Sequence, residues 1–511
     1  MSKNEKRHFK LFYSTYSKGE KSNYVKLFDA IDRLRNYDND KLLKLLNDKK
    51  IAGRLAVEKS FLYRLILGSL RHYYAEKSVD SILKNSLLEA KILFNRRLFK
   101  QCEKILIRSE KIAIENEKYE TLIEIARFYF GLYHRKYHFT DNRTLDTIYE
   151  RLDSTVNMLN NLIKYKRLQD SYFQISKRSH HFARKRNEAR EMRKIISHPL
   201  LKDKKSALSD SAKRIFYMLH AKYELSKRNY KEAGSYFLQQ VMLSKIKAEK
   251  GVVDPNEHIG DKYNYLVTLL MFEKDVAVVK KGLFDFRSLS EKYSKMGIER
   301  EIRRLITYDS YFLELGYYTQ NGLFEEAKSV SEAFEIKIIK EKDFCINPIE
   351  SGWFYLGVLY FGLQDYVKSL HYFNMILNDP LSEEREDIAC AAKIMILIVY
   401  YETENTDLMH YAVRSTYRYL MKRERVHPTE KILIDFIRKK MDKIFSKKDL
   451  TSELLIVEKK LIATFRKYPA EESFIKYFDI ISWLRSKIEN KSFAEIVRQR
   501  QRVLPVLSCR L

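Results

Sequence analysis

The sequence predicts an all-α protein, an α-solenoid of stacked antiparallel helix pairs with a helical cap at each end. Gly and Pro number only 14 and 7 among 511 residues. This is well below average usage and disfavours β-sandwiches and Rossmann-type folds, which need Gly and Pro in turns and phosphate loops. Hydrophobic residues make up 45% of the chain, enough for a packed core, which excludes a disordered chain.

Helical periodicity is the second observation behind this fold class. Apolar residues recur at helical spacing almost everywhere, and no segment shows the alternation of a strand. Ser288–Glu291 and Ser492–Glu495 have the spacing of a capping box, which predicts that helices begin there. Prolines are spaced by roughly the length of a helix–turn–helix unit in the second half of the chain, at Pro348, Pro380, Pro428, Pro469 and Pro505.

The sharpest repeat signal surrounds Trp353. Small residues at Gly357 and Ser369 allow two helices to approach closely, and large apolar side chains fill the space around that contact. The pattern runs through Trp353, Leu356, Gly357, Tyr360, Ser369, Phe373 and Pro380. It resembles the tetratricopeptide repeat (TPR), a helix pair of roughly 34 residues with Trp, Leu, Gly, Tyr, Ala, Phe and Pro at these places.

Three weaker copies support the resemblance, while a generic helical array with chance matches stays an alternative. The copies are Leu315–Gly316 with Phe324–Ala327, Ala221 with Tyr230–Ala233 and Phe237, and Ala90 with Phe99–Cys102. Terminal repeats of solenoids are usually atypical. We therefore expect an N-terminal helical cap over residues 1–75, a TPR-like array over 76–430, and a C-terminal helical cap with a basic tail over 431–511.

In TPR proteins the first helix of each pair lines a concave groove that holds a peptide or a partner helix. The resemblance therefore implies groove residues in this chain, although the same apolar side chains would be buried if other helices of the chain cover them. None of them matches the Lys/Asn set that clamps a terminal carboxylate in some TPR proteins. The candidates are Lys91, Lys222, Tyr317, Gln320, Phe354 and Phe361, with Leu87, Phe94, Met218, Leu225, Leu313 and Val358 at equivalent positions.

The segment from Lys177 to Lys205 is the strongest electrostatic feature of a chain whose net charge is +28. It contains eleven basic and three acidic residues, and Met192 and Ile196 belong to an apolar stripe that would dock it on the body. A phosphate backbone binds such a surface through counterion release, whereas a solvated helix face in a Lys-rich protein is the simpler explanation. The candidates for polyanion binding are Arg184, Lys185, Arg186, Arg193 and Lys194.

Motifs that carry chemistry are missing from the sequence. It contains no GxGxxG, phosphate-loop, HExxH or GxSxG pattern, so we expect no enzyme and no cofactor, although a site assembled from distant residues stays possible. His134 and His138 have helical i, i+4 spacing, but Arg135 and Lys136 between them would repel a cation, so we expect no metal site.

The compartment follows from targeting signals and cysteine usage. No apolar run of signal-peptide length follows the charged first residues, so we expect no signal peptide, and no apolar run is long enough to span a membrane. Four scattered cysteines form no disulfide framework, which favours the cytoplasm. We therefore expect a non-enzymatic, TPR-like scaffold or adaptor that binds a protein or peptide. The alternative is a nucleic-acid-associated regulatory protein that uses residues 177–205.

Overall fold

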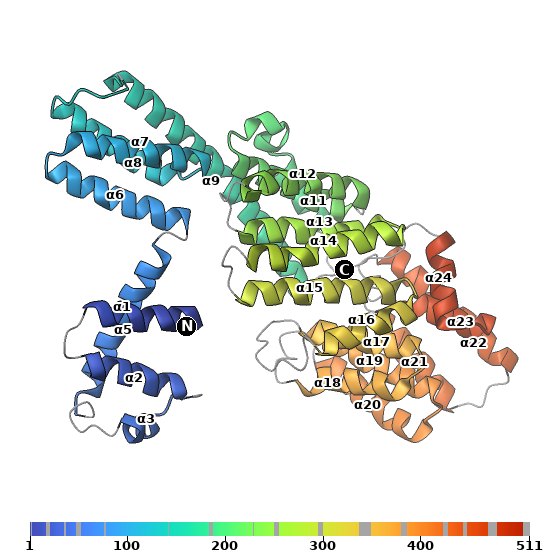
Figure 1. The fold of residues 1–511 in the computed structure, drawn as a ribbon. Coiled ribbons are helices and arrows are strands. Elements are labelled where there is room, and N and C mark those ends of the chain that lie inside the picture. Colours follow the sequence, from blue (N-terminus) through green and yellow to red (C-terminus); the bar gives the residue numbers. More distant parts are fainter. Residues whose placement is uncertain are drawn as a thin grey trace. The chain divides into compact units, whose positions relative to one another are not determined.

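In the computed structural model, every regular element of the described residues is a helix, and consecutive helices pack against each other (Figure 1). The predicted all-α, solenoid-like fold class is confirmed. Apart from some side chains near helix ends, the structure describes residues 1, 3–16, 21–34, 37–46, 53–75, 78–141, 143–182, 188–227, 229–249, 255–294, 300–336, 349–379, 386–422, 428–442, 447–468 and 478–503.

The chain forms two compact units, Met1–Leu162 and Ile163–Leu511. The predicted cap boundaries at residues 75 and 430 stay predictions. The first unit has two clusters of buried apolar side chains, one built around Phe9 and Leu27 and the other around Leu106 and Tyr129. Its helices are α1 (Lys3–Tyr16), α2 (Lys21–Arg33), α3 (Asn39–Leu46), α5 (Leu55–Tyr74), α6 (Val79–Asn95), α7 (Phe99–Glu115), α8 (Tyr119–His134) and the first part of α9 (Leu145–Phe182).

The second unit is a stack of helix pairs with one continuous apolar core, which extends from Ile259 to Leu484. Its α-helices are the rest of α9, α10 (Glu188–Ile196), α11 (Asp210–Ser226), α12 (Tyr230–Glu249), α13 (Pro255–Phe272), α14 (Val276–Ser294), α15 (Arg300–Gln320), α16 (Phe324–Phe334), α17 (Ile349–Gly362), α18 (Tyr366–Asn378), α19 (Glu386–Glu402), α20 (Thr406–Lys422), α21 (Pro428–Asp442), α22 (Lys447–Lys467), α23 (Ile480–Glu489) and α24 (Phe493–Val503). Two short 3-10 helices, η1 (Pro199–Leu201) and η2 (Lys204–Ser206), lie between α10 and α11.

The same three-residue turn joins several helix pairs. Its middle residue has a positive φ, and the N–H of its last residue donates to a carbonyl five residues earlier, as in a Schellman motif. Only one of these turns has glycine in the middle, which explains how a Gly-poor chain makes so many sharp turns. The middle residues and their φ angles are Arg97 (62°), Glu117 (53°), Gly322 (69°), Gln364 (62°) and Glu404 (53°).

The two predicted helix starts have different outcomes. α24 begins at Phe493, and the Ser492 hydroxyl accepts the Glu495 N–H at 3.2 Å, so that prediction is confirmed. The prediction of a start at Ser288 is wrong, because α14 begins at Val276 and continues through this position. There the Ser288 hydroxyl donates to the carbonyl of Asp285 at 2.8 Å, a bond that serine makes inside a helix as well.

The contact predicted around Trp353 is present between α17 and α18. The Ser369 hydroxyl donates to the carbonyl of Gly357 at 2.8 Å. The Phe373 ring lies so close that a Cβ on Gly357 would stand 2.5 Å from it. The two helices therefore touch through small residues, while Leu356 and Phe373 are fully buried beside them.

The C-terminal helices fold back onto the stack through a buried carboxylate. Glu402, at the end of α19, accepts a hydrogen bond from the Trp483 indole N–H at 2.6 Å and pairs with Lys487, both on α23. Asp479 caps the first turn of α23 and pairs with Arg500 of α24. Hydrogen bonds to a charged carboxylate are stronger than neutral ones, so these contacts fix α23 and α24 against the end of α19.

Substituting Gly357 tests the close contact between α17 and α18. Gly357→Ala is expected to lower the unfolding free energy by roughly 1–3 kcal/mol, because the new methyl group overpacks against Phe373. Gly260→Ala on α13 is the matched control, since a Cβ there meets no atom within 4 Å, and it is expected to raise stability by roughly 0.5–1 kcal/mol. Urea denaturation measures both, and equal effects would contradict this packing.

The turns predict a stabilising change as well. Gln364 is exposed and has a φ of 62°, a conformation that is unfavourable for residues with a Cβ. Gln364→Gly is therefore expected to raise the unfolding free energy by roughly 0.5–1 kcal/mol. The reverse change, Gly322→Gln, is expected to lower it, and a destabilised Gln364→Gly variant would contradict the turn geometry.

Candidate functional site

The first helices of successive pairs form the inner layer of the stack. Closer contacts link α13 to α15, α15 to α17, α17 to α19 and α19 to α21 than link the second helices of neighbouring pairs in the described residues. Helices on the inside of a curved stack lie nearer to one another, and repeat proteins bind ligands on this side. The inner layer is therefore the first place to look for a binding site.

The apolar groove candidates are buried in this layer. The exposed fraction is 4% for Tyr317, 2% for Phe354 and 3% for Phe361. The Phe361 ring contacts Phe478 and Phe493, with ring centres 5.2 and 5.7 Å away. Helices of the chain itself therefore cover Phe361, which is the alternative to an open groove. None of the three side chains offers a surface to a peptide in this structure.

The three polar candidates have separate environments. Lys91 is exposed on α6 of the first unit, whereas Lys222 and Gln320 belong to the second. The Lys222 ammonium lies 3.4 Å from the amide oxygen of Asn264, and burial lowers its pKa. The Gln320 amide donates to the Tyr355 hydroxyl at 3.2 Å. Lys222 and Gln320 thus each link two neighbouring helices of the inner layer, through different partners.

Two other helices of the chain, α9 and α24, contact helices of the stack beside the inner layer. Near α11, the Gln169 amide of α9 donates weakly to the sulfur of Met218, a groove candidate, at 3.4 Å. Near the turn after α15, a Cβ on Gly322 would lie 2.8 Å from the Ala494 carbonyl of α24. Phe493 of α24 stacks on Phe324 at 5.8 Å. The stack thus accepts helical segments by contacts of this kind.

Asp309 stands on α15 of the inner layer, and sequence reasoning missed it. It is half-buried, and no described residue forms a hydrogen bond or an ion pair with its carboxylate. Burial raises its pKa to about 7, and its charge adds to the effect of burial on the pKa of Tyr263. One turn further along α15, the centre of the Phe312 ring lies 5.2 Å from the centre of the Tyr355 ring. Asp309 is thus a carboxylate that no described residue pairs with, beside aromatic rings.

Two positions on α15 and α13, each one turn from Asp309 or Tyr263, are uncrowded. Leu305, one turn earlier on the same face of α15, is 40% exposed. On α13, Gly260 lies one turn before Tyr263, and a Cβ added there would meet nothing within 4 Å. The sequence offered only an acidic residue among the aromatic residues of α15, and no repeat pattern marks that position.

The basic segment is partly described. Met192 is 3% exposed and Ile196 half-buried, as the apolar stripe predicts, and Ile195 is buried as well. Arg193 and Lys194 of α10 are exposed. The other three polyanion candidates lie outside the described residues; they are Arg184, Lys185 and Arg186.

A buried polar cluster joins α11, α12 and α13. Ser244 Oγ lies 2.9 Å from His258 Nδ1, and Asp261 accepts two hydrogen bonds of 2.9 Å from Arg214. In a catalytic triad the histidine lies between the serine and the carboxylate, whereas here the carboxylate is held by an arginine. Ser244 is fully buried and His258 is 3% exposed, so the cluster connects helices and offers no access to a substrate.

Metal ligation and membrane insertion find no support in the described residues. No three His, Cys, Asp or Glu side chains come together there as metal ligands do. α8 ends at His134, and Lys136 has a φ of 56°, so the helical spacing assumed for His134 and His138 is wrong. Within the described part of the chain, no helix is both long and apolar enough to cross a bilayer.

Comparison with known proteins adds no assignment. No protein-family model matches this chain, and no curated protein or solved structure is significantly similar to it. The surfaces of the helices themselves must therefore indicate the function.

The buried His258 predicts a loss of stability in acid. Burial lowers its pKa to about 4, helped by the positive charge of Lys262 and other nearby cations. The folded state thus favours neutral His258, and the resulting stability is complete above pH 6.5 and lost as the pH falls towards 4. His258→Gln is expected to remove roughly 2–3 kcal/mol of this pH dependence. Urea denaturation between these pH values checks it, and identical profiles for both proteins would contradict it.

Proposed function

We propose that this protein is a non-enzymatic, TPR-like scaffold that holds a polypeptide partner against its inner helix layer. The paired helices, the recurring turn and the pattern around Trp353 support the repeat type. The described cysteines, Cys102 and Cys390, are buried free thiols, which fits a reducing compartment such as the cytoplasm.

One observation carries the proposal: the stack already holds helices α9 and α24 of its own chain, and α15 of the inner layer has a carboxylate, Asp309, without a described partner. A Lys or Arg side chain of the partner would pair with Asp309 and lie against the neighbouring aromatic rings. Such a cation favours the ionised carboxylate, so the partner is expected to bind more tightly above pH 7 than below it.

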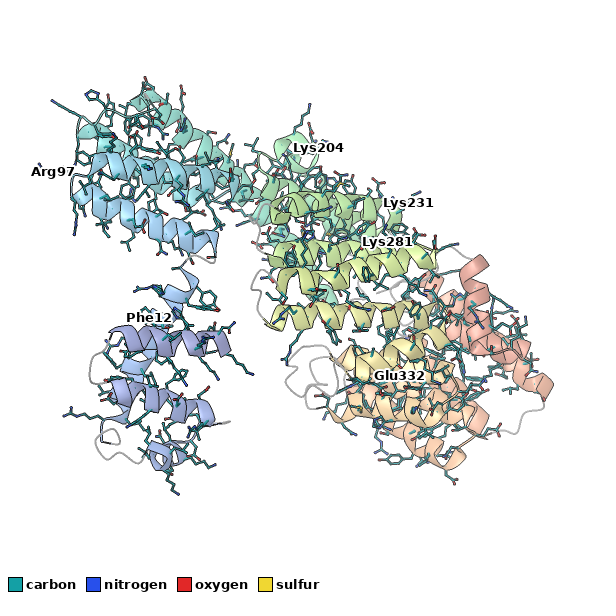
Figure 2. The ribbon with its side chains drawn as sticks, in the orientation of Figure 1. Phe12, Arg97, Lys204, Lys231, Lys281 and Glu332 are labelled. Carbon is teal, nitrogen blue, oxygen red and sulfur yellow. The ribbon has the colours of Figure 1, made fainter. Side chains whose placement is uncertain are left out.

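Photocrosslinking from Leu305 tests this site. Benzoylphenylalanine at this exposed position, one turn from Asp309, is expected to give one defined adduct in native lysate. Asp309→Lys is expected to remove most of that adduct, because it replaces the attracting charge by a repelling one. Glu332→Lys makes the same change of charge on α16, where Glu332 is exposed (Figure 2), and is expected to leave the adduct intact.

The outcome against the proposal is equally specific. An adduct that survives Asp309→Lys, or one that both substitutions weaken equally, would show that the carboxylate does not select the partner. Circular dichroism of each variant separates weaker binding by a folded protein from unfolding.

A further inference from the structure

The basic segment is a rigid platform and not a loose tail. Met192 and Ile195 bury one face of α10 beside α11. The carbonyl of Leu200 accepts a hydrogen bond from the Tyr165 hydroxyl at 2.5 Å, and His220 Nε2 lies 2.9 Å from the carbonyl of Leu201. η1 is thereby fixed to α9 and α11, and η2 packs on η1, so the charges on this segment have defined positions.

Every basic residue described between positions 190 and 205 is exposed, and none is paired with a described residue. By contrast, the nearby Arg214 is held by Asp261 and Glu257. The carboxylate of Asp203 accepts the backbone N–H of Lys205 at 2.9 Å, so its position is set by the turn. The six cations are Arg190, Arg193, Lys194, Lys202, Lys204 and Lys205.

The cations on α10 share one face of the helix. Arg190, Arg193 and Lys194 have i, i+3 and i+4 spacing, so their like charges repel one another in the free protein. A bound polyanion would relieve this repulsion and release counterions, which is the main source of sequence-independent binding to phosphate backbones.

We infer that residues 190–205 form a docking surface for the phosphate backbone of a nucleic acid. An anionic membrane fits less well, because a helix that lies in the lipid interface must bury its apolar face there, and α10 uses that face to pack on its own protein. A protein partner fits less well too, since the fully buried part of protein interfaces is apolar. This surface offers little apolar area: among the described residues from 190 to 208, Leu208 is the large apolar side chain with substantial exposure, at 43%.

Binding of a labelled duplex of about 20 base pairs to the full-length protein, followed by fluorescence anisotropy between roughly 50 and 300 mM KCl, tests the inference. The test variant is Arg190→Glu with Arg193→Glu and Lys194→Glu. It is expected to weaken binding by about tenfold or more. The logarithm of the binding constant falls linearly with the logarithm of the salt concentration. We expect the variant to reduce the steepness of this slope by roughly 0.9 for each phosphate that it no longer binds.

The matched control makes the same change of net charge elsewhere. Lys231, Lys280 and Lys281 are exposed on α12 and α14, and Lys231 and Lys281 are labelled at the surface in Figure 2. Their combined change to Glu is expected to alter affinity by less than about twofold. Equal reductions in affinity for both variants would overturn the inference, because they would reflect net charge alone.

Two further outcomes decide the remaining cases. If circular dichroism shows that the α10 variant does not fold, Lys202→Gln with Lys204→Gln and Lys205→Gln replaces it, and an unchanged affinity of that folded variant overturns the inference. Binding to vesicles that contain phosphatidylserine, with no binding to duplex DNA or single-stranded RNA, overturns it as well. The result is independent of the Asp309 site, because none of these substitutions lies on the inner layer.

Discussion

The second unit depends on the close approach of paired helices through small residues. Because Gly357 has no side chain, the Phe373 ring lies directly against the backbone of α17. The Ser369 hydroxyl donates a hydrogen bond to the carbonyl of Gly357. A pair joined in this way buries one side of each helix and leaves an apolar side that the next pair must cover. The continuous core from Ile259 to Leu484 follows from this requirement.

The C-terminal helices cover the edge of the stack at which α15, α17 and α19 end. Trp483 is 1% exposed and donates to Glu402, while Phe478 and Phe493 cover Phe361. The side chains that would line an open TPR groove therefore contribute to stability in this protein. This moves the search for a binding site to groups without partners among the described residues, which are the Asp309 carboxylate and the cations of residues 190–205.

The sequence predicts the helices well because their signals are local. The contact between Gly357 and Ser369 lies within the α17–α18 pair, and the cap at Ser492 lies between α23 and α24, and the structure has both as predicted. The fate of Phe361 depends on Phe478 and Phe493, which are distant in sequence, and no repeat pattern connects them to it. Ser288–Glu291 has the residue types and spacing of a capping box, but the helix that begins at Val276 continues through it.

The two candidate sites also differ in how far the sequence predicts them. The exposure of Arg193 and Lys194 follows from the periodicity of α10, because Met192 and Ile195 lie on its opposite, buried side. Asp309 cannot be found by periodicity, since its importance depends on which groups of α13 and α17 surround it. Whether a carboxylate has a partner is a property of the packed structure and not of its own helix.

Hydrogen exchange of the full-length protein tests most directly whether the C-terminal helices complete the stack. Amides of α23 and α24 are expected to exchange as slowly as those of α17 and α19, because all four helices share one core and open together. Exchange of α23 and α24 at the rate of an isolated helix, with α17 still protected, would contradict the account. Phe361 would then lie on an open groove.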